Sequence, residues 1–381
     1  MNVLLAGGGT GGHVYPGLAI AEALRRRDPS ARVLFVGSRA GMEASLVPAA
    51  GVPFVGLAVR PPRSRAPWRL AVSAASVGAG LAQAFVVVAR FRPDVVIATG
   101  GVAAVPSVLA AAVTNVPVVV LEGNVLPGRT NRTLARYSRV IAVSSDEAAA
   151  RLPVGRTVMT GLPIRREAYT ATREEGLAAF GLDRSRKTVL IIGGSQGAVR
   201  LNAAAEETVR RLAARGGLQV LHQVGGGWSG VERALMEAPG AQPEPSPLGG
   251  AIRYLRVPYV QHIGAAYACA DLVVSRCGAN ALAEITANGR PSILVPYPFA
   301  VDDHQTHNAS ALVAAGGAVL VPDAELTGER LARAITELLD TPGRLEAMAA
   351  SARSHGRPDA ADRVIALVSR LAEPLAEGVR G

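Results

Sequence analysis

The stretch NVLLAGGGTGGH at residues 2–13 decides the fold of the first half of the chain, because a short apolar run ends there in a glycine-rich turn. Glycines in such a turn let the backbone approach a ligand closely, and the following helix presents unpaired N–H groups that suit a phosphate. The spacing G-x-G-x-x-G from Gly7 to Gly12 also occurs in dinucleotide-binding domains, which need an acid after the second strand. GSR at 37–39 supplies none, so a nicotinamide cofactor is disfavoured, although Arg39 would suit a 2′-phosphate.

A second turn of the same kind, GGSQGA at residues 193–198, opens the second half of the chain. Short runs rich in Val, Ile and Leu alternate with alanine-rich stretches of helical length, which is typical of parallel sheets wrapped by helices. The pattern predicts an α/β fold: two Rossmann-like, parallel-sheet domains that face each other across a cleft for a nucleotide-linked substrate. We expect a hinge at 158–165 and strands at 2–6, 32–37, 94–98, 117–121, 139–143, 188–192, 218–222, 271–275 and 292–296.

Composition narrows the class of protein. With 381 residues the chain is too long for one ordinary core, and 49% hydrophobic against 18% charged residues exclude disorder. The net charge of +10 comes from arginine, Lys187 aside, which genome composition explains as well as an anionic partner does. Aromatic residues make up only 4%, so we expect no nucleic-acid partner. Two isolated cysteines, Cys269 and Cys277, and the lack of a signal peptide indicate the cytoplasm, without disulfides.

Residues 70–89 form an uncharged stretch, and three interpretations of it are open. The helical spacing of its larger apolar residues favours a helix packed on the first sheet. Alternatively, an arginine-rich rim of this helix rests on anionic lipid. A membrane span is disfavoured because serines, glycines and alanines make the stretch weakly hydrophobic. The flanking arginines are Arg60, Arg63, Arg65, Arg69, Arg90 and Arg92.

Two further motifs carry polar residues. In SRCGANALAEITANGRP at 275–291, Glu284 falls in the early turns of a helix, where it would accept ribose hydroxyls or merely complement the helix dipole. In DDHQTHNA at 302–309 the acidic pair and histidine point in different directions, so a metal site is disfavoured. Gln305 and Asn308 suit the hydroxyls of a sugar better.

Taken together, the four motifs at 7–13, 193–198, 275–291 and 302–309 resemble those of the UDP-N-acetylglucosamine–N-acetylmuramyl-(pentapeptide) pyrophosphoryl-undecaprenol N-acetylglucosamine transferases of peptidoglycan synthesis. The resemblance implies a GT-B fold with an acceptor and membrane-side domain (1–163 with 355–381, including a returning helix that starts in 358–367) and a UDP-sugar donor domain (164–354). It implies inverting transfer of N-acetylglucosamine from UDP-N-acetylglucosamine to the 4-hydroxyl of undecaprenyl-diphospho-N-acetylmuramoyl-pentapeptide, the last cytoplasmic step of precursor synthesis. It further implies a peripheral enzyme on the cytoplasmic face of an anionic membrane surface, with no cofactor and no metal.

The resemblance also implies roles for individual residues. Thr10, Gly11 and Gly12 would line the cleft near the diphosphate and the acceptor, Asn124 would touch the donor sugar, Arg165 would approach the diphosphate, and Ser195 would hold phosphate. Val260 would meet uracil through its backbone, Ala279, Asn280, Ala281, Leu282, Ala283 and Glu284 would wrap the nucleotide with Glu284 on the ribose, and Gln305 would bind the N-acetylglucosamine.

An attacking hydroxyl needs a base, and a histidine suits this role near neutral pH. His13, at the first glycine-rich turn, is our candidate, although it would also serve to bind the acceptor diphosphate or to cap the helix. Glu122 is the reserve candidate.

The chain departs from the family pattern at four places. It has Leu121-Glu122-Gly123-Asn124 where the family commonly has His-Glu-Gln-Asn, Val102 in place of a tyrosine, Leu162 in place of an asparagine, and Cys277 in place of a serine. Two rivals share parts of the pattern: a UDP-sugar transferase for a soluble acceptor, and an NADP-dependent oxidoreductase. The oxidoreductase leaves the second glycine turn unexplained, and a non-catalytic nucleotide-binding module leaves His13 unexplained.

Overall fold

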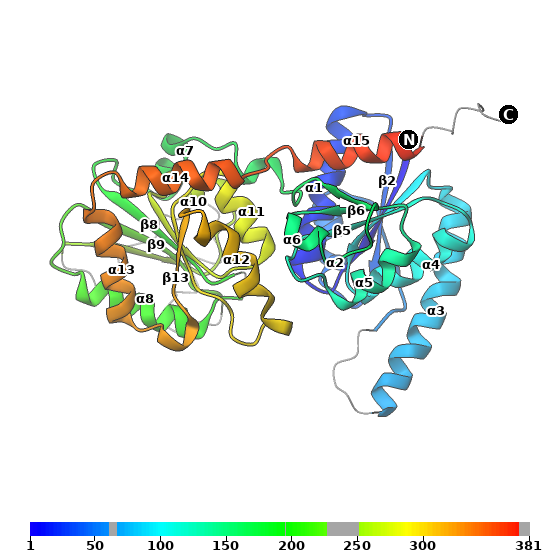
Figure 1. Ribbon diagram of the computed structural model, residues 1–381, viewed down its shortest axis with the longest axis horizontal. Coiled ribbons are helices and arrows are strands. Elements are labelled where there is room, and N and C mark those ends of the chain that lie inside the picture. The colour runs from blue at the N-terminus through cyan, green and yellow to red at the C-terminus, as the bar shows by residue number, and fades with distance from the viewer. Residues whose placement is uncertain (61–66, 195, 227–250, 373–381) are drawn as a thin grey trace. The chain divides into compact units, whose positions relative to one another are not determined.

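The structure is a computed structural model that describes residues 1–60, 67–194, 196–226 and 251–372 (Figure 1). The chain divides into two compact units. The first comprises residues 1–165 with 357–381, and the second comprises residues 166–356. The sequence analysis expected the chain to leave the first domain after residue 163 and to return to it at residue 355, close to the boundaries of these two units.

The first unit is built on seven parallel strands in the order β3-β2-β1-β4-β5-β6-β7. Leu5 of an inner strand pairs with Phe35 on one side and Ile97 on the other, and all three side chains are fully buried. The strands are β1 (Asn2–Gly7), β2 (Arg32–Ser38), β3 (Phe54–Leu57), β4 (Val95–Gly100), β5 (Val118–Glu122), β6 (Val140–Val143) and β7 (Thr157–Met159). The α-helices are α1 (Gly11–Arg27), α2 (Glu43–Ala49), α3 (Pro67–Phe91), α4 (Val105–Val113), α5 (Arg129–Leu134), α6 (Asp146–Ala149) and α15 (Ala360–Ala372).

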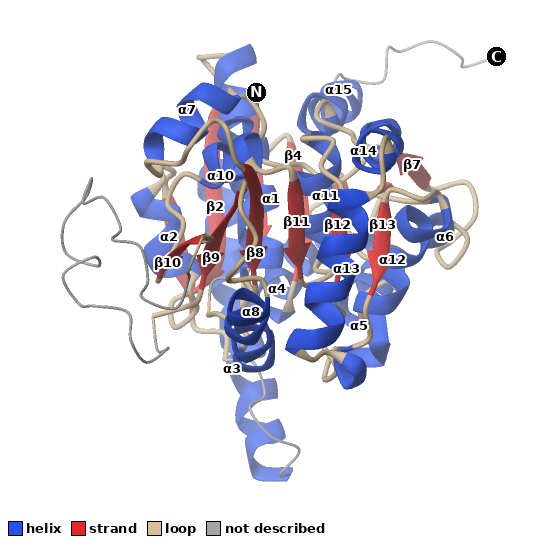
Figure 2. Ribbon diagram, turned by 90° about the vertical axis from the view of Figure 1, so that its left-hand side faces the viewer, coloured by secondary structure: helices blue, strands red, loops and turns tan. Residues whose placement is uncertain are grey.

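The second unit is built on six parallel strands, and Figure 2 shows them side by side in the order β10-β9-β8-β11-β12-β13. The strands are β8 (Lys187–Ile192), β9 (Leu218–Gln223), β10 (Arg253–Val257), β11 (Leu272–Ser275), β12 (Ser292–Leu294) and β13 (Ala318–Leu320). The α-helices are α7 (Arg173–Ala179), α8 (Val199–Arg211), α10 (Ile263–Cys269), α11 (Ala279–Ala287), α12 (His304–Ala314), α13 (Gly328–Asp340) and α14 (Arg344–His355).

All nine predicted strands are present, and the α/β class with two parallel-sheet domains is confirmed. Four further strands, β3, β7, β10 and β13, were not predicted, and they are the four edges of the two sheets. An edge strand pairs on one side only. The side chains of these four strands are only partly buried, so they lack the run of buried apolar residues that marks an inner strand.

Helix α3 confirms the core-packed interpretation of the 70–89 stretch for its described side chains. Val88 is buried, and Val77, Leu81 and Phe85 pack against the core of the first unit. The side chain of Leu70 lies outside the described residues, as do those of Arg63, Arg65 and Arg69. Within the described part of the chain, no helix combines the length and the apolar character needed to cross a membrane.

The C-terminal helix α15 belongs to the first unit and packs against α1. Arg26 of α1 forms an ion pair with Asp362 of α15 at 3.2 Å. The segment between α14 and α15 passes close to Gly161, because a Cβ atom on Gly161 would lie 2.6 Å from the Cβ of Arg357. Gly161 has a φ of +82°, so a glycine is required there both by conformation and by space.

A buried polar network ties α8 to the sheet of the second unit. Nδ1 of His222 on β9 accepts the hydroxyl of Tyr254 on β10 at 2.7 Å, and Nε2 donates to Oδ1 of Asn202 on α8 at 3.2 Å. This assignment of roles follows because the amide oxygen of Asn202 only accepts; its Nδ2 donates to the carbonyl of Val224 at 2.7 Å. Burial, and then the charge of Arg256, lowers the pKa of His222 to about 3, so its imidazole is neutral.

Candidate functional site

The first glycine-rich turn is shaped by a buried carboxylate. Gly9 has a φ of +88°, which only glycine adopts readily. Oε2 of Glu43 accepts the N–H of Gly9 and Oε1 accepts the N–H of Ser38, both at 2.9 Å. Glu43 also fills the space that a Cβ atom on Gly8 would need. An acid therefore does lie near the end of the second strand, but its oxygens bind the backbone of the turn.

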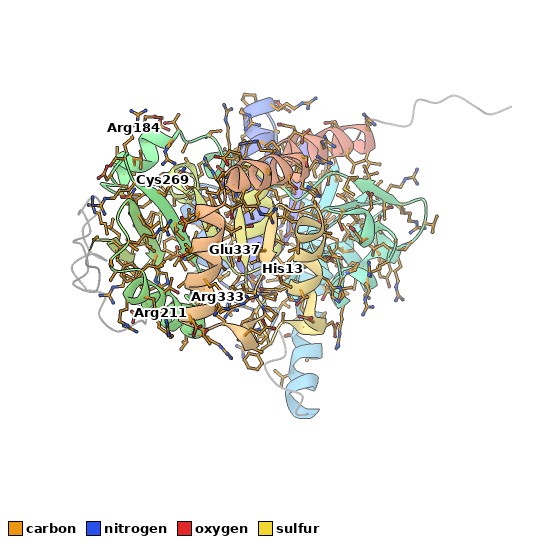
Figure 3. The ribbon with its side chains drawn as sticks, turned by 60° about the vertical axis from the view of Figure 1, so that its left-hand side comes forward. His13, Arg184, Arg211, Cys269, Arg333 and Glu337 are labelled. Atoms are coloured by element: carbon orange, nitrogen blue, oxygen red, sulfur yellow. The ribbon has the colours of Figure 1, made fainter. Side chains whose placement is uncertain are left out.

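His13, which is labelled in Figure 3, lies in the first turn of α1, and two polar contacts orient its ring. Its Nδ1 lies 3.0 Å from the carbonyl oxygen of Gly8 and 3.4 Å from the hydroxyl of Thr10. Because a carbonyl only accepts, Nδ1 donates its hydrogen to Gly8, which leaves Nε2 as the nitrogen able to take a proton. A Cβ atom on Gly100, at the end of β4, would lie 2.7 Å from Cδ2 of His13. The imidazole thus packs where that glycine leaves room.

The guanidinium of one arginine, Arg165, lies next to this turn. The guanidinium of Arg165 lies 5.3 Å from the ring centroid of Tyr15 on α1. The same ring would be 3.0 Å from a Cβ atom on Gly11, in the first turn of the helix. A stacked guanidinium beside the N-terminus of a helix suits an anion such as a diphosphate. Gly12 and Thr10 are exposed on the same turn.

Glu122 is buried at the end of β5 and is engaged on both oxygens. Oε1 accepts the backbone N–H of Asn124 at 2.8 Å and its side-chain amide at 3.3 Å. Oε2 accepts the N–H of Gly128 and the amide of Asn131, both at 2.9 Å. The carboxylate therefore fixes the 123–128 loop, and with it the backbone of Asn124, rather than facing a substrate as the reserve base was expected to do.

Two departures from the family pattern are in contact. A Cβ atom on Gly123 would lie 2.8 Å from Cδ1 of Leu162, so the leucine occupies the space that a larger residue at 123 would take. Leu121 is buried in the core of the first unit, and Val102 packs against that core. Cys277 is buried, and burial raises the pKa of its thiol to about 12, so it is not a thiolate nucleophile at neutral pH.

The second glycine-rich turn packs backbone against backbone. Gly194 and Gly197 have φ values of +96° and +74°. A Cβ atom on Gly197 would lie 2.1 Å from the carbonyl oxygen of Val224, so there is no room for a side chain at this position. The helix that follows, α8, begins at Val199, so its N-terminus opens on the turn. Ser195, the predicted phosphate contact, lies outside the described residues.

The loop after β10 is tied to this turn by a glutamine. The carboxamide of Gln223, the last residue of β9, donates to the carbonyl of Gly194 at 2.9 Å and accepts the N–H of Val260 at 2.8 Å. Val260 is buried, and its N–H is thus already used. The carbonyl group of Val260 is therefore the part of its backbone that would contact uracil.

Helix α11 presents its first turns and Glu284 from the end of β11. The helix follows Gly278, and Ala279, Asn280, Ala281 and Ala283 are half-buried, whereas the side chain of Leu282 packs in the core. Oε2 of Glu284 accepts the hydroxyl of Tyr267 at 3.1 Å. Burial and the adjacent carboxylate raise the pKa of Tyr267 well above its usual value, so it remains a donor.

Gln305 on α12 is oriented in a similar way. Its Oε1 accepts the N–H of Cys277 at 3.0 Å and that of Tyr297 at 2.9 Å, so its NH₂ group is the part that would donate to a sugar hydroxyl. Asp302 and Asp303, just before α12, have φ values of +53° and +51°, a conformation that costs about 1 kcal/mol or more for a non-glycine residue. Across the described ranges, no group of three or more His, Cys, Asp or Glu is arranged to hold a metal ion.

The predicted residues fall into two sets, one in each unit. Parallel strands bring their carboxyl ends to one edge of a sheet, and ligands bind at that edge. In the first unit the set is Thr10, Gly11, Gly12, His13, Glu122, Asn124 and Arg165; in the second it is Val260, Ala279, Asn280, Ala281, Leu282, Ala283, Glu284 and Gln305. The sequence analysis missed the buried residues that orient these groups, namely Glu43, Asn131, Gln223 and Tyr267.

Comparison with known proteins gives a consistent result along the whole chain. Residues 3–143 match the glycosyltransferase family 28 N-terminal domain, and residues 188–364 match the family 28 C-terminal domain. A protein of Desulforudis audaxviator named UDP-N-acetylglucosamine–N-acetylmuramyl-(pentapeptide) pyrophosphoryl-undecaprenol N-acetylglucosamine transferase is 41% identical over 374 residues, 98% of this chain and 99% of that one. A protein of Moorella thermoacetica with the same name is 41% identical over 377 residues, 98% of this chain and 100% of that one.

Comparison with solved structures agrees with the comparison of sequences. The crystal structure of Acinetobacter baumannii MurG is similar with a TM-score of 0.73 and 28% identity, covering 97% of this chain and 99% of that one. The calicheamicin glycosyltransferase CalG4 has a TM-score of 0.67 at 18% identity, covering 98% and 99%, and shows a shared fold only.

Proposed function

The chain belongs to the UDP-N-acetylglucosamine–N-acetylmuramyl-(pentapeptide) pyrophosphoryl-undecaprenol N-acetylglucosamine transferases of glycosyltransferase family 28, and we propose that His13 is the base of its reaction. The enzyme transfers N-acetylglucosamine from UDP-N-acetylglucosamine to the undecaprenyl-linked muramyl-pentapeptide. The observation that carries this function is the similarity over 98% of the chain to transferases of that name. The alternatives, a soluble acceptor or a nicotinamide cofactor, have no comparable support.

In the proposed mechanism, the 4-hydroxyl of the N-acetylmuramoyl residue attacks the anomeric carbon of the donor. A new bond forms from this oxygen to the carbon, the bond from the carbon to the β-phosphate oxygen breaks, and the configuration inverts. The hydroxyl proton passes to Nε2 of His13. The hydrogen bond from Nδ1 to the carbonyl of Gly8 supports this role, because it fixes the tautomer and stabilises the imidazolium that forms.

On the donor side, the second unit supplies the nucleotide site. Glu284 accepts the ribose hydroxyls, with Tyr267 orienting its carboxylate. The carbonyl of Val260 meets uracil, the backbone of Ala279 to Ala283 follows the nucleotide, and the NH₂ group of Gln305 donates to the N-acetylglucosamine. The N-terminus of α8 and the turn that contains Ser195 face the diphosphate, where negative charge grows as UDP leaves.

On the acceptor side, the first unit supplies an anion site. The N-terminus of α1, with Thr10, Gly11 and Gly12, and the stacked guanidinium of Arg165 bind diphosphate. Asn124 contacts the donor sugar, and its backbone is fixed by Glu122, to which we assign a positioning role. These residues need no metal to stabilise charge.

We propose that the enzyme acts at the cytoplasmic face of a membrane, where it meets the lipid-linked acceptor and anionic lipid. Helix α3 supports this proposal, since Figure 1 shows its first turns projecting from the first unit. Val72 and Val86 on this helix are each 50% exposed and lie about four helical turns apart, on nearly the same face. Arg90 and Arg92 are exposed at its C-terminal end, and Arg60, whose N–H donates to the hydroxyl of Ser76 at 3.0 Å, is exposed beside its first half. Apolar side chains flanked by cations are typical of helices that rest on anionic lipid.

The function is tested by incubating the purified chain with radiolabelled UDP-N-acetylglucosamine and an undecaprenyl-linked muramyl-pentapeptide. We expect label in the lipid product. Label in water-soluble products only, or no transfer at all, would refute the assignment. A parallel reaction with a short-chain, water-soluble analogue of the acceptor separates recognition of the muramyl-pentapeptide from recognition of the lipid surface.

A further inference from the structure

Gln223 is a buried glutamine at the carboxyl end of β9 that joins two parts of the second unit. It is only 3% exposed, and its carboxamide bridges the carbonyl of Gly194 and the N–H of Val260. Gly194 belongs to the glycine-rich turn before α8, and Val260 belongs to the loop after β10. We infer that Gln223 is a positioning residue of the donor site, which sets the distance between the part that binds diphosphate and the part that binds uracil. The inference rests on the proposed donor site.

The chemistry of the two partners explains why a carboxamide is required. One backbone group is an acceptor and the other is a donor, and both face the interior at the same side chain. Among side chains of this length, an amide offers both a donor and an acceptor on one planar group. A carboxylate would repel the carbonyl of Gly194, and an apolar side chain would leave both buried groups without a hydrogen bond.

The surrounding backbone makes the bridge sensitive to change. Gly225 donates to the carbonyl of Pro258 at 3.0 Å, and Val224 donates to that of Val257 at 2.9 Å. A Cβ atom on Gly225 would lie 2.4 Å from the carbonyl oxygen of Gln196, within the glycine-rich turn. The three segments therefore meet through their main chains, and Gln223 provides the side-chain link from the turn to the loop.

This arrangement predicts an effect on binding of the nucleotide rather than on the chemical step. The side chain of Gln223 is covered by the segments that it joins, so it would not touch the reacting atoms. A change in the spacing of the two segments would weaken every ligand that spans them. UDP spans both, so its affinity and the KM for the donor should change, while kcat with saturating donor should not.

The test compares Gln223→Glu with Gln219→Glu by calorimetry with UDP. Gln219 is a matched control, because it is a fully buried glutamine on the same strand and it bridges backbone groups too, accepting the N–H of Asp183 at 3.0 Å and donating to its carbonyl at 2.8 Å. It lies at the other end of β9. The glutamate at 223 keeps the acceptor for Val260 but loses the donor for Gly194 until it is protonated.

We expect Gln223→Glu to weaken UDP binding about tenfold or more at pH 8, the cost of one buried hydrogen bond, and Gln219→Glu to leave it near the native value. As the pH is lowered toward 6, the affinity of Gln223→Glu should recover relative to native protein at the same pH, because burial favours protonation of the carboxyl. Equal affinity of native protein and Gln223→Glu overturns the inference, as does equal weakening by both variants. If Gln223→Glu does not fold, Gln223→Met replaces it: weaker UDP binding with a native melting temperature supports the inference, and unchanged binding overturns it. Failure of native protein to bind UDP would instead refute the proposed function.

Discussion

Lowering the pH should reduce the free energy of unfolding of the second unit through protonation of one buried histidine, His222. Burial lowers the pKa of His222 from 6.5 to about 3 in the folded state. Between these values the unfolded chain binds a proton that the folded chain does not, so stability is complete above pH 6.5 and falls as the pH falls toward 3. The loss is about 1.4 kcal/mol per pH unit, which gives about 2 kcal/mol between pH 6.5 and pH 5.

Amide hydrogen exchange read by mass spectrometry measures this locally, in peptides that cover β9, and avoids treating a two-unit protein as a two-state system. In His222→Gln the difference in opening free energy between pH 8 and pH 5 should shrink by about 2 kcal/mol relative to native protein. The absolute stability of this variant will also fall, because the bond from Tyr254 is altered, so the dependence on pH is the informative quantity. His307, exposed on α12, provides the control variant His307→Gln. Parallel pH profiles for native protein and His222→Gln would refute the reasoning.

Three further predictions concern the two binding sites. His13→Ala should lower kcat by about 10² to 10⁴ with UDP affinity nearly unchanged, and near-normal turnover would exclude it as the base. Gly100→Ala should also lower kcat, because the added methyl group would lie 2.7 Å from the imidazole of His13. Gly155→Ala is the control, because Gly155 also has a positive φ (+78° against +117° for Gly100) but has no atom within 4 Å of the new methyl group. Equal rates for the two variants would contradict the packing argument. Glu284→Ala should weaken UDP binding measured by calorimetry, and Tyr267→Phe should weaken it less, by about fivefold, since only one orienting hydrogen bond is lost; unchanged UDP affinity in Glu284→Ala would defeat the ribose assignment.

The predictable part of the fold was its centre. Strands such as β1 and β8 are buried on both faces and have two neighbours, so their sequences are continuous apolar runs that stand out without a structure. The edge strands β7 and β13 have three residues each and are partly exposed, and their assignment depends on the neighbour that they pair with. Pairing across the sheet is a tertiary property, which local sequence does not contain.

The candidate site also has a part that local sequence predicts and a part that depends on tertiary contacts. Glycine-rich turns and the helix with Glu284 follow from local patterns, because backbone conformation and helix position are local properties. Glu43, Gln223 and Tyr267 were missed, since each acts on a segment far away in the sequence through a side chain whose direction only the fold determines. A single buried Glu or Gln after a strand carries no signal of its own in the sequence.

The contact between Gly123 and Leu162 has a consequence for how this enzyme could have diverged from its relatives. A glutamine at 123 would meet the side chain of Leu162, so restoring the common family residue at that position alone requires the leucine to move. The two positions are therefore sterically coupled, because a larger side chain at 123 needs a displaced or smaller side chain at 162. Active-site loops exchanged between homologues should carry both positions together.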